Sequence, residues 1–197
     1  MNSSLPAIPV LVTSLLLFGC RQLPAGISSK SAPASVKAPD NAVRKNALHL
    51  LCDLLGDEKN LSKLLIIKKA TPELKQLVKA ISETAATELK TLDTWRGTNR
   101  PPAKAQLGLP PGETATREAI SKTKQHELLH SSGSELEFQL LLTQAEALNY
   151  GKHLALVISE NEPDTIHAQK ASAMSQELNQ LREQVLSRLR RSNRNRS

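Results

Sequence analysis

The sequence predicts an all-α protein, and three observations lead to that class. Aromatic residues make up only 2% of the 197-residue chain, so a core must be built from Leu, Ile, Val and Ala, which favours helices over strands. Apolar residues recur at steps of three and four through several long segments, the spacing of one helix face. A stretch rich in Pro and Gly, residues 96–112, interrupts these segments and divides the predicted helices into two groups.

An apolar run at residues 8–18 precedes Cys20 near the start of the chain. The stretch Leu17-Phe18-Gly19-Cys20 resembles the lipobox of bacterial lipoprotein signal peptides, in which the cysteine is acylated and becomes the first residue of the mature protein. The run is too short for a hydrocarbon core that needs about 20 apolar residues. An ordinary secretory signal would have small residues around its cleavage site, which this stretch offers only in part, and no partner follows for a buried strand.

The lipobox resemblance implies that residues 1–19 are a signal peptide and that Cys20 is lipidated. Arg21 follows the cysteine where inner-membrane lipoproteins have Asp, so the resemblance favours the outer membrane of a Gram-negative cell, facing the periplasm. Residues 20–39 are rich in Ser, Ala, Pro and Gly and are expected to form a disordered tether. Membrane lipid is therefore the first expected partner, and an envelope protein or peptidoglycan is a further candidate.

A helical domain is predicted over residues 40–191, and its first helix runs from a cap at Asp40 or Asn41 to about Lys69. Gly56 lies inside this helix and is expected to weaken or bend it. The apolar stripe consists of Val43, Ala47, Leu50, Leu51, Leu54, Leu61, Leu64 and Leu65.

The second predicted helix starts at Thr71-Pro72-Glu73, with a hydroxyl cap, a proline at the first helical position and a carboxylate near the positive helix end. It ends near Trp95, and the short connection makes the first two helices an antiparallel hairpin. Its apolar stripe consists of Leu74, Leu77, Val78, Ile81, Ala85, Leu89 and Leu92.

The second half begins with a short, mostly polar helix expected at about residues 113–131. Ser134 is expected to cap the next helix, with Glu137 completing a capping box, and this helix continues to about Glu160. Pro163-Asp164 then turns the chain into the last helix. The apolar residues of these two long helices are Phe138, Leu141, Leu142, Ala145, Leu148, Leu154, Ala155 and Ile158, then Ala171, Met174, Leu178, Leu181, Val185 and Leu189.

The predicted domain has two helical hairpins joined by a proline-rich crossover. The crossover leads into a short helix that opens on Leu-Pro-Pro-Gly-Glu (residues 109–113), and Ser-Glu-Leu-Glu-Phe (residues 134–138) follows this helix. This arrangement, over about residues 41–190, resembles the ferritin-like helical domains of bacterial envelope proteins of unknown function. The resemblance implies a ferritin-like four-helix bundle with one short extra helix, and it assigns no activity. The basic residues 192–197 that follow the domain are expected to form a disordered tail.

His126-Glu127-Leu128-Leu129-His130 fits H-E-x-x-H, in which two histidines one turn apart bind zinc and the glutamate acts as a general base. The preceding residues are largely charged or polar, and a third ligand would have to come from Glu135, Glu137 or His153. A solvated helix face is the favoured interpretation, and a zinc hydrolase is the alternative.

A ferritin-like di-metal centre would need a Glu from each of two helices and Glu-x-x-His from each of the other two. Only Glu127 to His130 has that spacing. The other candidate ligands are more simply explained as the edges of apolar stripes, so no metal or other cofactor is expected. They are Glu58, Glu88, Glu146, Tyr150 and His153.

The net charge of +7 and pI near 9.6 would ordinarily suggest nucleic acid. An exported protein rarely meets any, so the charge is expected either to meet anionic lipid headgroups or envelope polymers, or simply to keep the protein soluble. The basic cluster at the C-terminus fits either a solvated helix end or docking to phosphate-bearing lipid. It consists of Arg188, Arg190, Arg191, Arg194 and Arg196.

Cys52 lies among leucines and is expected to be a buried, unreactive thiol. Neither G-x-S-x-G nor a phosphate-binding glycine loop occurs in the sequence. We therefore expect a non-enzymatic envelope lipoprotein with a helical binding or structural domain. The alternative is a metal-dependent hydrolase or oxidase centred on His126, Glu127 and His130.

Overall fold

The computed structural model describes residues 40–96 and 111–194, and within these two ranges it contains helices and no strand. The predicted all-α class is therefore confirmed for the described chain. Cys20, the expected tether and Arg196 lie outside the described residues. The helices are α1 (Asn41–Glu58), the short 3₁₀ helix η1 (Leu61–Lys63), α2 (Leu64–Ile67), α3 (Pro72–Arg96), α4 (Pro111–His130), α5 (Gly133–Asn161) and α6 (Thr165–Arg194).

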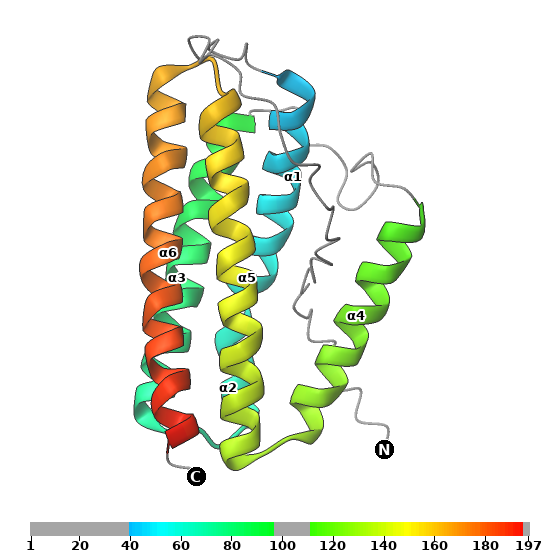
Figure 1. The fold of residues 1–197 in the computed structure, drawn as a ribbon, viewed down its shortest axis with the longest axis vertical. Coiled ribbons are helices and arrows are strands. Elements are labelled where there is room, and N and C mark those ends of the chain that lie inside the picture. The colour runs from blue at the N-terminus through cyan, green and yellow to red at the C-terminus, as the bar shows by residue number, and fades with distance from the viewer. Residues whose placement is uncertain (1–39, 97–110, 195–197) are drawn as a thin grey trace, which may run out of the picture.

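Helices α1, α3, α5 and α6 stand side by side as a bundle, and α4 lies to one side of it (Figure 1). Helix α1 packs against α3 and α5, and α6 packs against α5 and α3. Each of these neighbouring pairs is antiparallel, whereas α3 and α5 run in the same direction (Figure 1). The chain from α3 to α5 must therefore return along the bundle, and α4 is the helix that does so.

The bundle core consists almost entirely of aliphatic side chains contributed by all four long helices. Leu51, Leu92, Leu140 and Ile158 are completely or almost completely inaccessible to solvent. Gly151 on α5 allows close packing, because a Cβ there would lie 2.9 Å from Leu54 Cδ2. The same Cβ would lie 3.2 Å from a methyl of Leu178 on α6. The absence of a side chain at this position thus permits α5 to approach two neighbours at once.

The first helix ends earlier than the sequence predicted, at Glu58 instead of about Lys69. The Asn60 side chain donates a hydrogen bond of 2.9 Å to the carbonyl oxygen of Gly56, while the Asn60 backbone N–H bonds Asp57. This tightened turn ends the α-helical ladder. After it, η1 and α2 turn Leu61, Leu64 and Leu65 into the core, which explains why the apolar stripe continued past the break.

Three of the predicted helix starts are confirmed. The Asp40 carboxylate accepts hydrogen bonds from the backbone N–H groups of Ala42 and Val43, so Asp40 is the cap of α1. Thr71 Oγ1 accepts the Leu74 N–H at 3.3 Å and caps α3. Asp164 accepts the backbone N–H of the residue three positions later at 2.9 Å and starts α6.

The capping box predicted at Ser134 is wrong. The N-cap of α5 is Ser132, two residues before the predicted cap, and its side chain makes no capping bond. Gly133 has φ +57°, a left-handed backbone conformation that glycine adopts without steric cost, so the chain can reverse there from α4 into α5. Glu137 is instead paired with Arg188 of α6 at 2.9 Å.

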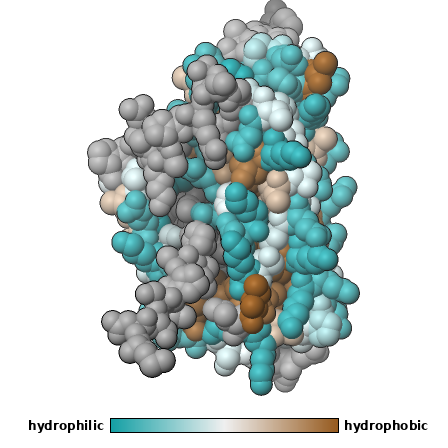
Figure 2. All heavy atoms as spheres, turned by 180° about the vertical axis from the view of Figure 1, so that it is seen from behind, coloured by the Kyte–Doolittle hydropathy of each residue, from teal (hydrophilic) through white to brown (hydrophobic). Residues whose placement is uncertain are grey.

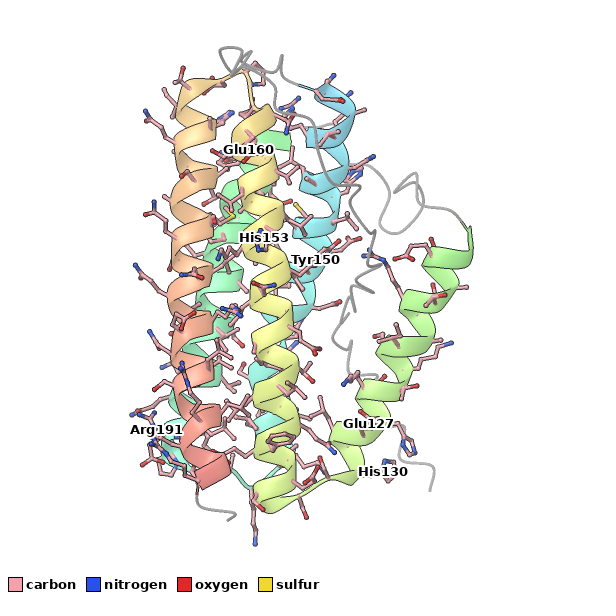
Figure 3. All side chains as sticks on the ribbon, in the orientation of Figure 1. Glu127, His130, Tyr150, His153, Glu160 and Arg191 are labelled. Carbon is pink, nitrogen blue, oxygen red and sulfur yellow. The ribbon has the colours of Figure 1, made fainter. Side chains whose placement is uncertain are left out.

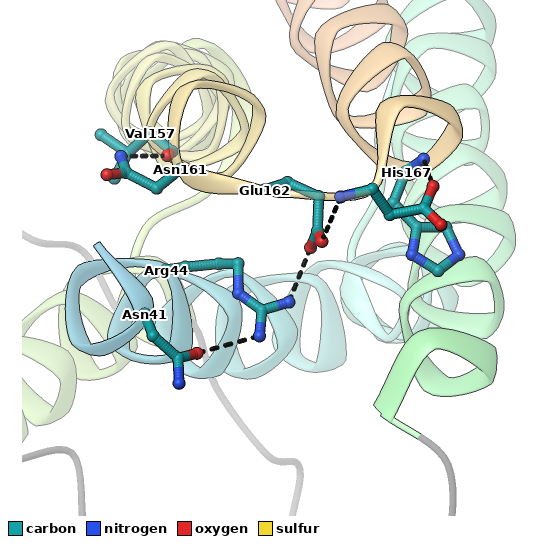
Figure 4. A network of polar contacts seen from close by, with 7 residues as sticks. Asn41, Arg44, Val157, Asn161, Glu162 and His167 are labelled. Atoms are coloured by element: carbon teal, nitrogen blue, oxygen red, sulfur yellow. Dashed lines mark hydrogen bonds and ion pairs between the residues drawn. The ribbon is translucent and has the colours of Figure 1, made fainter. Parts of the chain in front are cut away.

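A polar network closes one end of the bundle, where α1 begins and α5 passes into α6 (Figure 4). Arg44 donates to the Glu162 carboxylate at 2.7 Å and to Asn41 at 3.0 Å. The Asn161 amide oxygen accepts the Asp40 backbone N–H at 3.1 Å. Because the Glu162 side chain is only 4% exposed, this ion pair is shielded from water and fixes α1 to the α5–α6 connection.

The observed ends of the crossover agree with its proline-rich sequence, since α3 ends at Arg96 and α4 begins at Pro111. Helix α6 continues to Arg194, past residue 191 where the helical domain was expected to end. No helix in the described ranges has the length and apolar character that a membrane span requires.

Candidate functional site

The H-E-x-x-H residues lie near the end of α4, on a face turned away from the bundle helices, as the labels of Glu127 and His130 show in Figure 3. The rings of His126 and His130 stack with centroids 4.0 Å apart, and His130 Nδ1 lies 2.8 Å from the His126 carbonyl oxygen. Glu127 lies 4.0 Å from the Lys124 ammonium. All three predicted residues are exposed, and this stacked arrangement brings no third ligand to them.

The candidate di-metal ligands do not converge on one point. Tyr150 accepts a hydrogen bond of 3.3 Å from Arg117, whose guanidinium lies 5.7 Å from the Tyr150 ring centroid, and His153 is exposed. Among residues 40–96 and 111–194 there is no group of three or more His, Cys, Asp or Glu side chains that could hold a metal ion. A catalytic zinc site requires three protein ligands, so this part of the chain offers no such centre.

Glu58 is the most deeply buried carboxyl group in the described chain, with a relative exposure of 2%. Its carboxylate oxygens and the amide atoms of the buried Gln144 on α5 have no hydrogen-bond partner of good geometry among the described residues. Burial raises the pKa of Glu58 to about 8, with Gln144 opposing the rise and the charge of Asp57 adding to it. Glu58 is therefore largely protonated at neutral pH, as expected for an isolated carboxyl group in an apolar core.

Glu88 on α3 and Glu177 on α6 form an unusual carboxyl pair. Partial burial, the charge of Glu177 and a hydrogen bond between the two groups together raise the pKa of Glu88 to about 7. Thr84 donates a hydrogen bond of 3.2 Å to Glu177. The pair can share one proton across the α3–α6 contact. Sequence reasoning identified Glu88 but not its partner, which belongs to a helix more than eighty residues further along the chain.

Arg188 holds together three helices at the end of the bundle opposite the Arg44 network. Its guanidinium donates to the Glu137 carboxylate of α5 at 2.9 Å and to Thr71 Oγ1, the cap of α3, at 2.7 Å. Lys68 donates to the carbonyl oxygens of Leu129 and Ser131, the latter at 2.9 Å. Three segments therefore meet at this end of the bundle. They are the connection from α2 to α3, the turn from α4 to α5, and the last turns of α6.

We call this region the basic end and define it as residues 63–75, 129–139 and 182–194. The labels of Arg191 and His130 in Figure 3 mark the helix ends that meet there. Its acidic residues are Glu73, Glu135, Glu137 and Glu183. Its Lys and Arg residues are more numerous and comprise Lys63, Lys68, Lys69, Lys75, Arg182, Arg188, Arg190, Arg191 and Arg194.

The opposite end has no comparable excess of one charge. Residues 40–45, 90–96 and 160–170 contain Asp40, Asp93, Glu160, Glu162 and Asp164, balanced by Arg44, Lys45, Lys90, Arg96 and Lys170. The positive charge of the described chain is therefore concentrated at the end where α6 finishes.

The predicted arginine cluster is only partly available to a partner. Arg188 is largely buried by its contacts with Glu137 and Thr71, with an exposed fraction of 15%. Arg190 approaches Glu183 at 3.9 Å and donates to the Leu186 carbonyl oxygen. Arg190, Arg191 and Arg194 are exposed, whereas Arg188 has a structural role that the sequence did not reveal.

Ile66 is a surface residue that sequence reasoning missed, and it is 83% exposed at the basic end. Lys63 and Lys69, three positions before and after it, are also exposed. The Lys-x-x-Ile-x-x-Lys spacing is visible in the sequence. It could be recognised as a surface feature only once the first helix was known to end at Glu58.

Cys52 is 5% exposed, which confirms the prediction of a buried side chain. No protein family model, curated protein or solved structure matches this chain.

Proposed function

We propose that the protein is a membrane-anchored envelope lipoprotein whose helical domain binds a partner or has a structural role without catalysing a reaction. The observation that carries the proposal is the stretch Leu17-Phe18-Gly19-Cys20 at the end of an apolar run. Two or three acyl chains on Cys20 would hold the domain firmly at a bilayer, because each buried methylene contributes about 0.8 kcal/mol. The outer membrane is the proposed location, since Arg21 and not Asp follows the cysteine.

A ferritin-like arrangement of the domain belongs to the same proposal. It is supported by the antiparallel packing of α1 with α3 and of α5 with α6, together with one long connection between two helices that run in the same direction. Bundles with a single crossover of this kind include the ferritin-like folds. The domain would use this scaffold without the usual metal ligands, because the carboxylates of the described helices do not converge.

Labelling with radioactive palmitate tests the anchor. Cells that produce the wild-type protein should give a labelled product that fractionates with membranes, and Cys20→Ala should abolish the label. Cys52→Ala is the matched control, because it removes the other cysteine of the chain and should leave the label in place.

Either a labelled Cys20→Ala protein, or a wild-type protein found in the cytosol with residues 1–19 intact, would refute the anchor. Elemental analysis addresses the remaining alternative. Stoichiometric zinc or iron in the purified protein would overturn the non-enzymatic proposal in favour of a metal-dependent one.

A further inference from the structure

We propose that the basic end, with Ile66 at its surface, docks directly on a bilayer that carries anionic phospholipid. The proposal concerns a surface assembled from α2, the start of α3 and the end of α6, and not the C-terminal arginines alone. It deepens the proposed envelope function by naming the face that meets the membrane. The docking itself does not require acylation of Cys20.

The first argument is the charge that remains after internal pairing. Two of the acidic groups are already paired, Glu137 with Arg188 and Glu183 with Arg182 at 3.1 Å. The Lys68 ammonium is held by backbone carbonyl oxygens. Lys63, Lys69, Lys75 and Arg191 of the same segments are exposed, and they outnumber the remaining acidic residues, Glu73 and Glu135. The surface presented to solvent therefore has an excess of cations, which an anionic headgroup layer would neutralise.

The second argument is the exposure of Ile66. A large aliphatic side chain that is 83% exposed loses most of the stabilisation it would gain from burial. It lies in the short helix α2, with the exposed Lys63 before this helix and the exposed Lys69 after it. An apolar side chain with basic residues close to it in the chain can enter the acyl region while the ammonium groups stay with the phosphates. Figure 2 shows hydrophobic surface near this end of the back face, bordered by hydrophilic side chains.

The combination of groups favours a bilayer over a soluble polyanion. A polyanion would satisfy the lysines and Arg191 but would leave Ile66 in water. An anionic bilayer satisfies both, because phosphates and hydrocarbon lie within one side-chain length of each other. Ile166, which is 64% exposed, lies at the opposite end, where acidic and basic residues balance, and it therefore serves as the internal comparison.

The position of the anchor is compatible with this docking. The described chain begins at Asp40, at the end opposite the basic end (Figure 1). Helix α6 has 30 residues, so the two ends are separated by about 45 Å at roughly 1.5 Å per residue. The twenty residues from Cys20 onward can span at most roughly 70 Å. A lipid on Cys20 and contact through the basic end can therefore involve the same bilayer.

The experiment uses the full chain with Cys20→Ala, so that acylation cannot contribute. Binding is measured by co-sedimentation with phosphatidylcholine vesicles, with and without phosphatidylglycerol, at low and high salt. The apolar run at residues 8–18 is present in every variant, so differences between variants report the folded domain. Circular dichroism and the thermal midpoint establish that each variant is folded.

Charge reversal and apolar substitution each have a matched control at the other end. Lys69→Glu with Arg191→Glu should weaken binding to phosphatidylglycerol vesicles by at least about twentyfold, because each basic residue near such a surface contributes about fivefold. Lys45→Glu with Lys170→Glu makes the same change in net charge and should alter binding by less than about twofold. Ile66→Asp should weaken binding by about tenfold or more, and Ile166→Asp should have little effect.

Each contrary result would overturn the proposal. Equal binding with and without phosphatidylglycerol would exclude recognition of anionic lipid. Equal losses in the two charge-reversed pairs would show a general effect of net charge. Undiminished binding of Ile66→Asp, together with competition by inorganic phosphate, would indicate a phosphate site and not a bilayer surface. None of these results bears on palmitate labelling of Cys20, so the two proposals fail separately.

Discussion

Glu58 is the residue whose environment departs most from the preference of its type. A glutamate in the apolar core loses its hydration, and no ion pair with a basic residue replaces it within residues 40–96 and 111–194, so the neutral form is favoured. The residue closes the last turn of α1, where its backbone carbonyl oxygen accepts a hydrogen bond of 3.1 Å from Ser82. Its side chain therefore follows the backbone into the core at the point where α1 meets α3.

The burial of Glu58 gives the stability of the protein a defined pH dependence. The ordinary pKa is 4.5 and the folded-state pKa is about 8, so the folded state retains a proton that the unfolded chain loses. The contribution of Glu58 to the free energy of unfolding should be highest below about pH 4.5. This contribution should fall as the pH rises to about 8. Glu58→Gln should stabilise the protein at pH 8 by on the order of a few kcal/mol. It should also reduce the slope of the free energy of unfolding against pH.

Urea unfolding at several pH values between 5 and 8 measures this effect. Glu88, whose pKa is about 7, also makes the free energy of unfolding fall as the pH rises toward 7. The pH dependence of the Glu58→Gln variant should therefore be weaker than that of the wild type but not zero. Glu160→Gln, on the exposed surface of α5, is the control and should leave the profile unchanged. A Glu58→Gln profile that overlays the wild type would contradict the assignment.

At the scale of the helices, close approach at one glycine decides how α5 packs. Gly151 faces Leu54 of α1 and Leu178 of α6 at distances that leave no room for a larger side chain. Gly56, by contrast, lies near the end of α1 with nothing within 4 Å of a Cβ built there. Two glycines with the same intrinsic helix propensity therefore have opposite structural roles.

Substitution of these glycines should separate propensity from packing. Gly56→Ala should stabilise the protein by about 0.5–1 kcal/mol, because alanine is the better helix former and meets no neighbour. Gly151→Leu should destabilise it by about 1–3 kcal/mol or more, because the new side chain must displace two leucines from a packed interface. Chemical denaturation of both variants provides the measurement, and a Gly151→Leu protein as stable as Gly56→Ala would disprove the close contact.

At the scale of the whole molecule, stability should be unevenly distributed between the bundle and α4. Helix α4 packs against α5, and Leu128 is its one residue among the buried hydrophobic side chains of the described chain. Ile120 and Leu129 are partly exposed. Few buried contacts mean that local opening of a segment costs little free energy.

Amide hydrogen exchange should therefore be faster in α4 than in α5 or α6. The difference should be greatest in the first turns of α4, which lie furthest from Leu128. Helix α5 is an internal standard because it contacts both α1 and α6. Equal protection of α4 and α5 would show that α4 opens only with the rest of the bundle.

Much of the fold could be predicted from the sequence. Helix starts were predicted at Asp40 or Asn41, at Thr71 and after Pro163-Asp164, and the structure shows that Asp40, Thr71 and Asp164 cap these helices. Most of the buried leucines were also identified. The predicted continuation of the first helix to Lys69 and the cap at Ser134 were wrong. In the first case a turn stabilised by the Asn60 side chain interrupted an apolar pattern that continued past it. In the second case the left-handed conformation of Gly133 placed the start of α5 before Ser134.

Local sequence signals were sufficient to predict the helical class, the order of the long helices and most of the apolar face that each one buries, because caps, prolines and helical spacing act between residues close together in the chain. Helix packing, by contrast, was needed to show that Glu58 is enclosed, that Glu88 meets Glu177, and that Arg188 holds helices together. Only the tertiary structure gathered lysines and arginines from separate segments around Ile66. These features depend on desolvation and on charges from distant parts of the chain, and both are fixed only when the helices pack.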